Sequence, residues 1–407
     1  MKSVEEAYAE VLAAFAPLGS ERVPLLSSLG RFSARRVVAD KELPPFDNSA
    51  MDGYAFAARD LAETSAAAPL VLPVRGESRA GGERLDPLVP GSAQRIFTGA
   101  PLPPGADTVE LQENVARDGD KVRFERAPRP GANVRARGSD VALGAPALEA
   151  HCLIGPGEIA LLASLEQASV DVFRRPRVAI VCTGDELRDL GAPARPGSIV
   201  NSNAYALVAQ VREAGADAWL LPPARDRRDE IVEALRAALS ADVVVLSGGV
   251  SVGEYDLVRD ALADVGVELA FYKVRMKPGK PLSFGRNGRV PVLGLPGNPV
   301  SAWVTFELFV RPGLRLMLGD PSPSRARLQV RLTRALAHAP GRTEFARAQL
   351  RATPAGVLAA PLANQGSGAL SSLVGVDALL EIPADRGDLP AGTELRAWLV
   401  RALPDAP

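Results

Sequence analysis

The chain has 407 residues, 47% of them hydrophobic and 23% charged, which is the composition of a globular protein too long for a single hydrophobic core. Its formal net charge of −1 argues against binding to nucleic acid or to a membrane surface, because both need an excess of basic residues. Two cysteines, Cys152 and Cys182, and two histidines argue against a disulfide framework, a Cys/His zinc centre and a serine–histidine hydrolase. Catalysis is therefore expected to rest on Asp, Glu, Lys, Arg, Ser and Thr.

No stretch of the sequence approaches the roughly 18 uncharged apolar residues of a membrane-spanning helix. The first residues, Met-Lys-Ser-Val-Glu-Glu, are acidic and amphipathic, unlike a secretory signal. We therefore expect a cytoplasmic protein whose partners are small molecules or other proteins.

The N-terminal stretch predicts a helix. Ser3 and Glu6 form a capping-box pattern, and apolar residues from Val4 to Phe15 recur at helical spacing, which indicates one buried face. The segment 44–54 that follows is dense in Asp, Asn, Ser and Gly and too polar for a core. It is either a network of side-chain-capped turns or a functional loop.

From about Val71 to Val141 the pattern changes to short alternating runs broken by glycine and proline, which predicts a small β domain. Within it, segment 95–100 ends a strand on Thr98, and segment 135–140 places two arginines beside Asp140. Each segment could equally be a solvated turn. A capped helix is predicted over 155–165, and we expect it to return the chain to the first helix.

Strands and helices alternate regularly from Pro176, which predicts a doubly wound α/β sheet. The predicted strands are 177–183, 218–221, 242–247, 267–273 and 290–295, and the predicted helices are 203–214, 227–239, 256–265 and a long apolar helix from Pro299 towards Leu318. Renewed alternation after Pro321 predicts a small all-β domain that closes the chain.

The most informative stretch is 242–256. A β-branched run, typical of a strand buried on both faces, breaks into a serine–glycine loop before the next predicted helix, with Ser247, Gly248, Gly249, Ser251 and Gly253 in the loop. Such a loop at the carboxyl end of a parallel strand lets backbone N–H groups and a helix N-terminus approach a phosphate. An ordinary tight turn is the alternative.

Two further loops are expected at the same edge of the sheet. They are Thr183-Gly184-Asp185-Glu186 and Pro296-Gly297-Asn298-Pro299. In the second, Asn298 suits a helix N-cap and Pro299 suits the first helical position. Because ligands of open α/β sheets bind outside the carboxyl ends of the strands, the three loops together favour a ligand crevice over three unrelated turns.

Charged residues near these loops suit phosphate chemistry. Only six of 47 basic residues are lysine, and three of them, Lys273, Lys277 and Lys280, fall within eight positions; their compact ammonium groups suit an oxyanion. The carboxylates of Glu186, Asp226 and Asp256, at or just past strand ends, could hold Mg²⁺. Surface salt bridges between these charges are the alternative. The sequence contains neither a P-loop nor a dinucleotide-binding glycine motif.

Seven motifs in order carry a resemblance to a known family. They are Asp-Asn-Ser-Ala-Met-Asp-Gly-Tyr-Ala at 47–55, Thr-Gly-Ala at 98–100, Thr-Gly-Asp-Glu-Leu at 183–187, Ser-Gly-Gly-Val-Ser-Val-Gly at 247–253, Lys-Pro-Gly-Lys-Pro at 277–281, Pro-Gly-Asn-Pro at 296–299 and Gln-Gly-Ser-Gly at 365–368. Together they resemble the molybdopterin molybdenumtransferase family, which inserts molybdate during molybdenum cofactor biosynthesis. The resemblance covers nearly the whole chain.

The resemblance implies a multidomain α/β plus β protein with four domains. These would be a discontinuous helical linker (1–45 with 142–175), a small β domain (46–141), a molybdopterin-binding α/β domain (176–322) and a C-terminal β barrel (323–407). It also implies a homodimer whose active site lies between the α/β domain of one subunit and the small β domain of the other. The reaction would cleave adenylylated molybdopterin with Mg²⁺ present, release AMP and insert molybdate.

The resemblance also assigns roles to individual residues. The implied catalytic residues are Asp52, Thr98, Asp140, Glu186, Asp226, Asp256, Lys273 and Lys277, of which Glu186, Asp226 and Asp256 would bind the metal. Substrate would be bound by Thr183, Gly184, Asp185, Ser247, Gly248, Gly249, Ser251, Gly253, Pro296, Gly297, Asn298 and Pro299. Molybdate would be held by Lys277, Lys280, Ser301, Arg342, Arg347 and Ser371 or Ser372. Ser139 stands where the family commonly has an acidic residue, which weakens the assignment of Asp140.

Two other functions remain open. A molybdopterin adenylyltransferase resembles the α/β part, but it has no counterpart of segment 47–55 or of the C-terminal β domain. A non-catalytic scaffold would tolerate loss of the carboxylates and lysines, all of which are present. Expected protein contacts are the adenylyltransferase that supplies the substrate and the acceptor molybdoenzymes.

Overall fold

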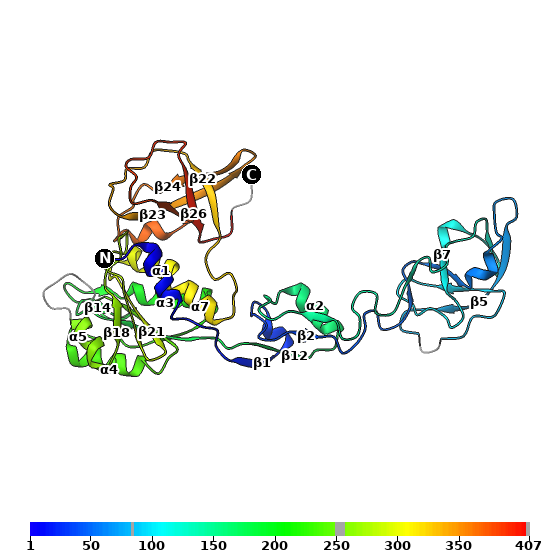
Figure 1. The fold of residues 1–407 in the computed structure, drawn as a ribbon, viewed down its shortest axis with the longest axis horizontal. Coiled ribbons are helices and arrows are strands. Elements are labelled where there is room, and N and C mark those ends of the chain that lie inside the picture. Colours follow the sequence, from blue (N-terminus) through cyan, green and yellow to red (C-terminus); the bar gives the residue numbers. More distant parts are fainter. Residues whose placement is uncertain (83–84, 249–256, 404–407) are drawn as a thin grey trace.

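The computed structural model describes residues 1–82, 85–248 and 257–403. Figure 1 shows an elongated molecule in which two compact parts at one end are joined through a narrow middle section to a separate β domain at the other end. No helix among the residues so described is long and apolar enough to cross a membrane.

Helix α1 (Val4–Leu12) begins with the predicted capping box: the hydroxyl of Ser3 accepts from the N–H of Glu6 at 3.1 Å, and the carboxylate of Glu6 accepts from the N–H of Ser3 at 2.7 Å. Its buried face packs into the α/β core beside α7. The predicted helix 155–165 is α2 (Pro156–Ser164), which packs in a different cluster, against η1 (Leu25–Ser28). The expectation that the two helices meet is therefore wrong, because the apolar face of α1 packs against the core of the α/β domain.

The middle section consists of two passes of the chain. Strand β1 (Ser20–Pro24) pairs antiparallel with β12 (Ser169–Phe173), and β2 (Val37–Val38) pairs with β11 (Pro146–Leu148). Helix α2 packs on β11 and η1. Two short antiparallel strand pairs, as well as the predicted helix, therefore form this section.

The distal β domain is built on a six-stranded sheet of order β7-β4-β6-β5-β9-β8. Phe56 and Phe124 meet edge to face in its core, with ring centroids 5.1 Å apart. A two-stranded ladder, β3 (Asn48–Ser49) with β10 (Val134–Arg135), flanks the sheet. The sheet strands are β4 (Gly53–Phe56), β5 (Leu70–Ser78), β6 (Ala93–Ile96), β7 (Thr108–Leu111), β8 (Ala116–Asp118) and β9 (Lys121–Phe124); η2 (Ala58–Leu61) and η3 (Gln112–Asn114) connect them.

The predicted α/β sheet is present, with order β16-β13-β17-β21-β20-β18. Its four parallel strands are β13 (Arg177–Cys182), β16 (Asp217–Leu220), β17 (Val243–Ser247) and β21 (Val290–Leu295), and an antiparallel edge is formed by β18 (Glu268–Phe271) and β20 (Ser283–Asn287). Strand β17 is wholly buried, as its β-branched run predicts. Helices α3 (Ser202–Glu213), α4 (Arg228–Ala238) and α5 (Leu257–Asp264) complete the two apolar layers.

The long apolar helix predicted after Pro299 is interrupted. Helix α6 (Pro299–Thr305) passes through a π turn, η4 (Phe306–Val310), into α7 (Arg311–Met317). Pro312 has no N–H to donate to the preceding turn, so the ordinary helical ladder cannot run through this point.

The C-terminal domain is a closed barrel of order β23-β24-β22-β26-β25, with β25 returning to β23. Its strands are β22 (Arg327–Leu332), β23 (Thr343–Thr353), β24 (Gly356–Pro361), β25 (Ala378–Ile382) and β26 (Glu394–Leu399), with η5 (Leu370–Leu373) before β25. A two-residue strand from the α/β domain, β19 (Met276–Lys277), pairs in parallel with the start of β23. The fold is thus the predicted combination of α/β and β parts.

Candidate functional site

A cavity of about 650 Å³ opens at the carboxyl ends of β13, β17 and β21. We call it the crevice. It lies where the strand order reverses around β13, the position at which open α/β sheets bind ligands. The three predicted loops meet there, since its lining includes Thr183, Gly184, Glu186, Asp226, Ser247, Gly248 and all four residues of 296–299.

Two glycines stand where the chain leaves no room for a side chain. A side chain on Gly248, whose φ is +98°, would overlap the carbonyl oxygen of Thr183. A side chain on Gly184 would lie 2.5 Å from a carboxylate oxygen of Glu186, which folds back over it. At Gly248 the two loops therefore meet backbone to backbone and leave no room for a side chain. The predicted residues Gly249, Ser251, Gly253 and Asp256 lie outside the described residues.

Sequence reasoning missed Asn203 at the N-terminus of α3. Its side-chain amide donates to the hydroxyl of Ser247 at 3.0 Å and to the carbonyl of Gly297 at 2.8 Å, so it ties two of the loops together. Ser202 and Asn203 both line the crevice, which brings the positive end of α3 to it. The run Asn-Ser-Asn at 201–203 was the available signal, because such residues favour helix N-termini.

Three of the predicted carboxylates, those of Asp185, Glu186 and Asp226, lie at or near the crevice. Asp185 and Asp226 exchange hydrogen bonds, each accepting weakly from the other's backbone N–H at 3.3 to 3.4 Å. Glu186 and Asp226 line the cavity. Carboxylate oxygens are the ligands that Mg²⁺ prefers, but within residues 1–82, 85–248 and 257–403 no three metal-binding side chains come together.

Beneath the crevice, Cys182 ends strand β13 and is buried. Burial raises the pKa of its thiol to about 11. The thiol therefore stays protonated near neutral pH and is not available as a metal ligand.

Asn298 occupies the predicted N-cap position of α6, but its side chain does not cap the helix. Its amide instead donates to the hydroxyl of Ser367 at 3.2 Å, and the N–H of Val300 donates to the carbonyl of Ser367 at 3.1 Å. The motif at 365–368 thus satisfies the first turn of α6 from the barrel domain, which frees the Asn298 side chain for a contact between domains.

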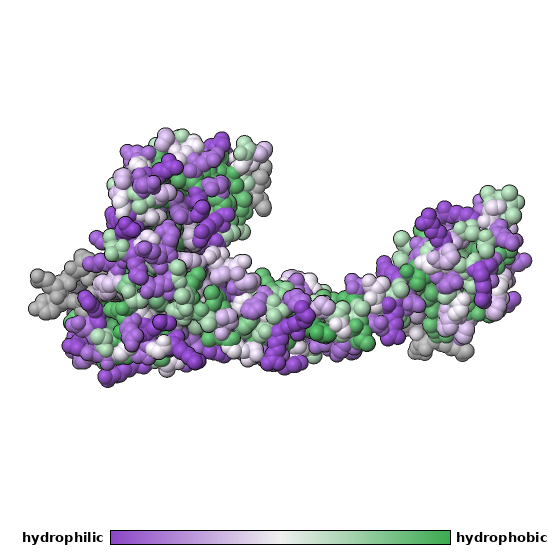
Figure 2. All heavy atoms as spheres, in the orientation of Figure 1, coloured by the Kyte–Doolittle hydropathy of each residue, from purple (hydrophilic) through white to green (hydrophobic). Residues whose placement is uncertain are grey.

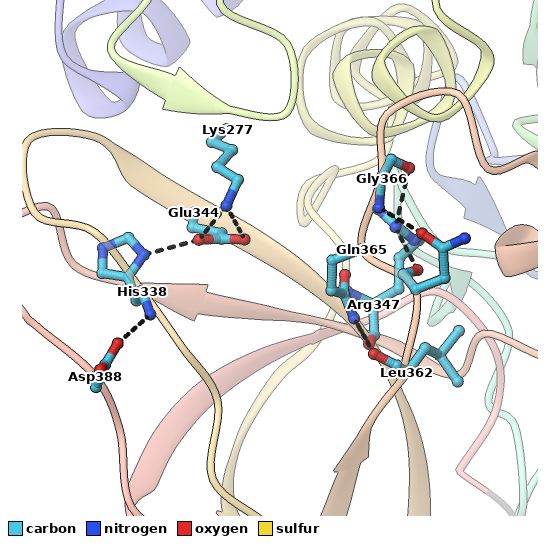
Figure 3. Close-up of polar contacts among 9 residues, drawn as sticks. Lys277, His338, Glu344, Arg347, Leu362, Gln365, Gly366 and Asp388 are labelled. Carbon is cyan, nitrogen blue, oxygen red and sulfur yellow. Dashed lines mark hydrogen bonds and ion pairs between the residues drawn. The ribbon is translucent and has the colours of Figure 1, made fainter.

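The segment 273–280 carries the three clustered lysines. Lys277 lies in β19, and its ammonium is 3.0 and 3.2 Å from the two carboxylate oxygens of Glu344 in the barrel (Figure 3). Glu344 is 3% exposed and also accepts from His338 at 2.8 Å. Lys280 is exposed and Lys273 half-buried. The salt-bridge alternative holds for Lys277, but its partner is this buried glutamate and not a crevice carboxylate.

The other predicted molybdate ligands differ in accessibility. Arg342 and Ser371 are exposed, whereas Ser301 and Ser372 are buried. Arg347 is fully buried and donates to the carbonyls of Asn364 and Gly366 (Figure 3), at 2.9 and 3.3 Å. Burial lowers the pKa of its guanidinium, and the charge of Glu344 opposes this. Arg347 therefore supports the loop at 364–366 and could not touch a dissolved anion unless that loop moved.

Comparisons with known proteins cover all parts of this architecture. The MoeA N-terminal region (domain I and II) matches residues 2–165, a probable molybdopterin binding domain matches residues 179–316, and the MoeA C-terminal region (domain IV) matches residues 329–400. A molybdopterin molybdenumtransferase 2 of Mycobacterium tuberculosis is 39% identical, with 98% of this chain and 99% of the relative covered. The chain belongs to the molybdopterin molybdenumtransferase family.

Other members extend the match. The molybdopterin molybdenumtransferase of Nostoc sp. is 42% identical over 74% of this chain and 70% of its own length. A crystal structure of the molybdopterin biosynthesis moeA protein from Pyrococcus horikoshii OT3 superposes with a TM-score of 0.84 at 31% identity, covering 98% of this chain and all of that one. The family resemblance read from the seven motifs is thus confirmed.

The remaining residues that this molybdenumtransferase resemblance implies lie in the distal β domain. The carboxylate of Asp52 accepts from the N–H of Thr98 at 2.7 Å and from its hydroxyl at 2.8 Å, and these hydrogen bonds lower the pKa of Asp52. Asp140 is exposed. Figure 1 places this domain at the opposite end of the molecule from the crevice, so one chain does not bring the two sets together.

Proposed function

We propose that this chain transfers molybdenum from molybdate to adenylylated molybdopterin and releases AMP and molybdenum cofactor. The observation that carries the proposal is the crevice, where the Ser247-Gly248 backbone, the N-terminus of α3 and the carboxylates of Glu186 and Asp226 line one cavity. The names of the relatives support the chemistry, because they are molybdopterin molybdenumtransferases matched over nearly the full chain.

In this proposal the adenylate phosphate lies against Gly248 and the N-terminus of α3, where backbone N–H groups favour an anion. Glu186 and Asp226, together with Asp256 outside the described residues, would hold Mg²⁺. A metal bound there would supply positive charge against the phosphate of the adenylate. Asn203 keeps Ser247 and Gly297 in place, and the fixed loops orient the phosphoester.

Molybdate, a tetrahedral dianion, would bind beside Lys277 and Lys280, with the exposed side chains of Arg342 and Ser371 as further donors. The segment 273–280 supports this placement because it runs from the α/β sheet to the barrel and ends next to Pro281, which lines the crevice. No protein thiol is required, since the sulfur ligands of molybdenum are the dithiolene of the substrate and Cys182 is a buried, protonated thiol.

A homodimer would complete the site. Asp52, Thr98 and Asp140 belong to the distal β domain, which lies at the opposite end of the chain from the α/β domain (Figure 1), and this supports a partner subunit that supplies them. The narrow middle section also leaves large apolar side chains exposed, and Figure 2 shows apolar surface along it. These side chains belong to Leu26, Leu29, Val38, Leu143 and Leu153.

Mixing inactive variants tests the shared site. Asp52→Ala and Glu186→Ala chains, each inactive alone, should recover about a quarter of wild-type activity after co-refolding, because half of random dimers carry one intact site. A mixture that stays inactive while sedimenting as a dimer would place the site within one chain.

AMP release tests the function itself. Purified protein should release AMP from adenylylated molybdopterin only when molybdate is present, and the product should activate an apo-molybdoenzyme. Formation of the adenylate from molybdopterin and ATP would instead identify an adenylyltransferase. Inertness in both assays would favour a scaffold.

A further inference from the structure

A buried histidine–carboxylate pair lies directly behind Lys277. In the register of β19 with β23, Lys277 is opposite Glu344. Glu344 holds the Lys277 ammonium on one side and faces Nδ1 of His338 on the other, 2.8 Å away (Figure 3). The side chains of His338 and Glu344 are 1% and 3% exposed, whereas that of Lys277 is 44% exposed. The pair is thus enclosed, whereas Lys277, which forms an ion pair with Glu344, is partly exposed.

Charged residues from three parts of the chain surround the pair. Lys277 approaches from β19, Arg347 attracts Glu344 from within β23, and Asp388 accepts from the backbone N–H of His338 at 2.8 Å. The other ring nitrogen of His338, Nε2, is buried and has no hydrogen-bond partner among the described residues. Nothing in the proposed chemistry uses this histidine, although it touches the ion pair of a predicted molybdate ligand.

A dianion arriving at Lys277 changes the balance of charge. It competes with Glu344 for the ammonium and adds negative charge beside a carboxylate that cannot reach water. A buried carboxylate deprived of its partner is costly, and nearby negative charge strengthens proton binding by neighbouring groups. His338 is the titratable group in contact with Glu344 that can take up a compensating proton.

We propose that molybdate binding at Lys277 is coupled to uptake of a proton from solvent by the His338–Glu344 pair, with His338 as the proton acceptor. This inference rests on the proposed function, because it needs molybdate at Lys277. No covalent bond changes except the N–H formed on the imidazole. His338 acts through Glu344 and Lys277, so it is a positioning residue that does not touch the anion.

The sign of the pH dependence follows from linkage. If the complex holds one proton more than the free protein, the affinity for molybdate falls as pH rises. The fall amounts to at most about tenfold per pH unit, within the range where only the complex is protonated. Molybdate remains a dianion at neutral pH and above, so its own protonation does not produce this slope.

Calorimetry measures the coupling directly. Molybdate alone is titrated into the full chain in two buffers of equal pH and different ionisation enthalpy. The wild type should take up a fraction of a proton approaching about one where the slope is steepest. Heats that do not depend on the buffer would overturn the inference while leaving the molybdate site intact. Absence of molybdate binding would overturn the placement of molybdate and this inference together.

A matched pair of variants assigns the proton. His338→Asn keeps an amide donor for Glu344 but has no nitrogen that titrates, so it should bind molybdate without proton uptake. The only other histidine is His151, whose ring contacts the carbonyl of Gly319 and Phe173, so His151→Asn should retain uptake. Persistent uptake in His338→Asn would overturn the assignment. If His338→Asn does not fold, the wild-type titration still decides whether the coupling exists.

Discussion

The crevice and segment 273–280, called here the lysine segment, are neighbouring parts of one proposed site. They are held together by different kinds of interaction. In the crevice the loops meet closely at Gly248, and they are held by the neutral amide of Asn203. The lysine segment depends on full charges, with Lys277 held by a buried glutamate. The difference indicates that substitutions disturb the crevice mainly by steric changes, whereas they disturb the lysine segment mainly by changes in charge.

The largest expected effect is at Gly248. Gly248→Ala places a methyl group on the carbonyl of Thr183 at a φ of +98°, a strain of about 1–3 kcal/mol. Because the loops must then move, AMP release should fall by about 100-fold or more. The matched control is Gly157→Ala, where an added methyl group meets no atom within 4 Å. Equal activity of the two variants would contradict the spatial account of the crevice.

Lys277→Ala should weaken molybdate binding much more than nucleotide binding. Loss of a charge-assisted contact of about 1.5–3 kcal/mol should raise the half-maximal molybdate concentration by about 10- to 100-fold. Nucleotide affinity should change much less, because the crevice is held by other residues. Removal of the ammonium also strands Glu344, so the double variant Lys277→Ala/Glu344→Gln should regain thermal stability. Equal loss of nucleotide and molybdate binding would refute this division.

Asn203→Ala is the converse test. It removes two hydrogen bonds between loops of the crevice, each of about 1 kcal/mol, so adenylate affinity should fall by roughly tenfold. Molybdate affinity measured by calorimetry should stay at the wild-type value. An Asn203→Ala protein with weakened molybdate binding would show that the two parts are mechanically coupled.

The smallest effect is expected at the distal domain. Thr98→Ala removes the hydroxyl donor to Asp52 and leaves the backbone donor, so the pKa of Asp52 should rise part of the way to its ordinary value. Asp52 contributes its stability above the unfolded-state pKa and loses it as pH falls through the folded-state pKa. Carboxyl chemical shifts followed during acid titration measure the change. Thr98→Ser should retain the wild-type titration.

Local patterns predicted the elements and the meeting of the loops. The β-branched run of β17 and the Pro299 helix start each follow from short stretches of sequence. What could not be predicted depends on contacts between distant segments. Ser367 of the barrel contacts the start of α6, where Asn298 was expected to cap the helix. Helix α1 packs on the α/β core.

The same limit applies to the candidate site. The motif around Arg347 predicts a guanidinium that binds a dissolved anion. Only the packed barrel shows that this guanidinium is enclosed beneath residues 364–366. Likewise, Asn203 joins Ser247 to Gly297 across two strands, a contact that neither sequence neighbourhood reveals. Residue type was readable from the sequence, whereas accessibility was not.

The short strand β19 has a mechanical consequence. The barrel closes through its own strands, yet the start of β23 also accepts Met276 and Lys277 from the α/β domain. Any hinge rotation between barrel and α/β sheet must therefore either carry the ammonium of Lys277 along or break this ladder. The position of the ammonium proposed to bind molybdate therefore depends on the angle between the two domains, and the ladder transmits a change in that angle to it.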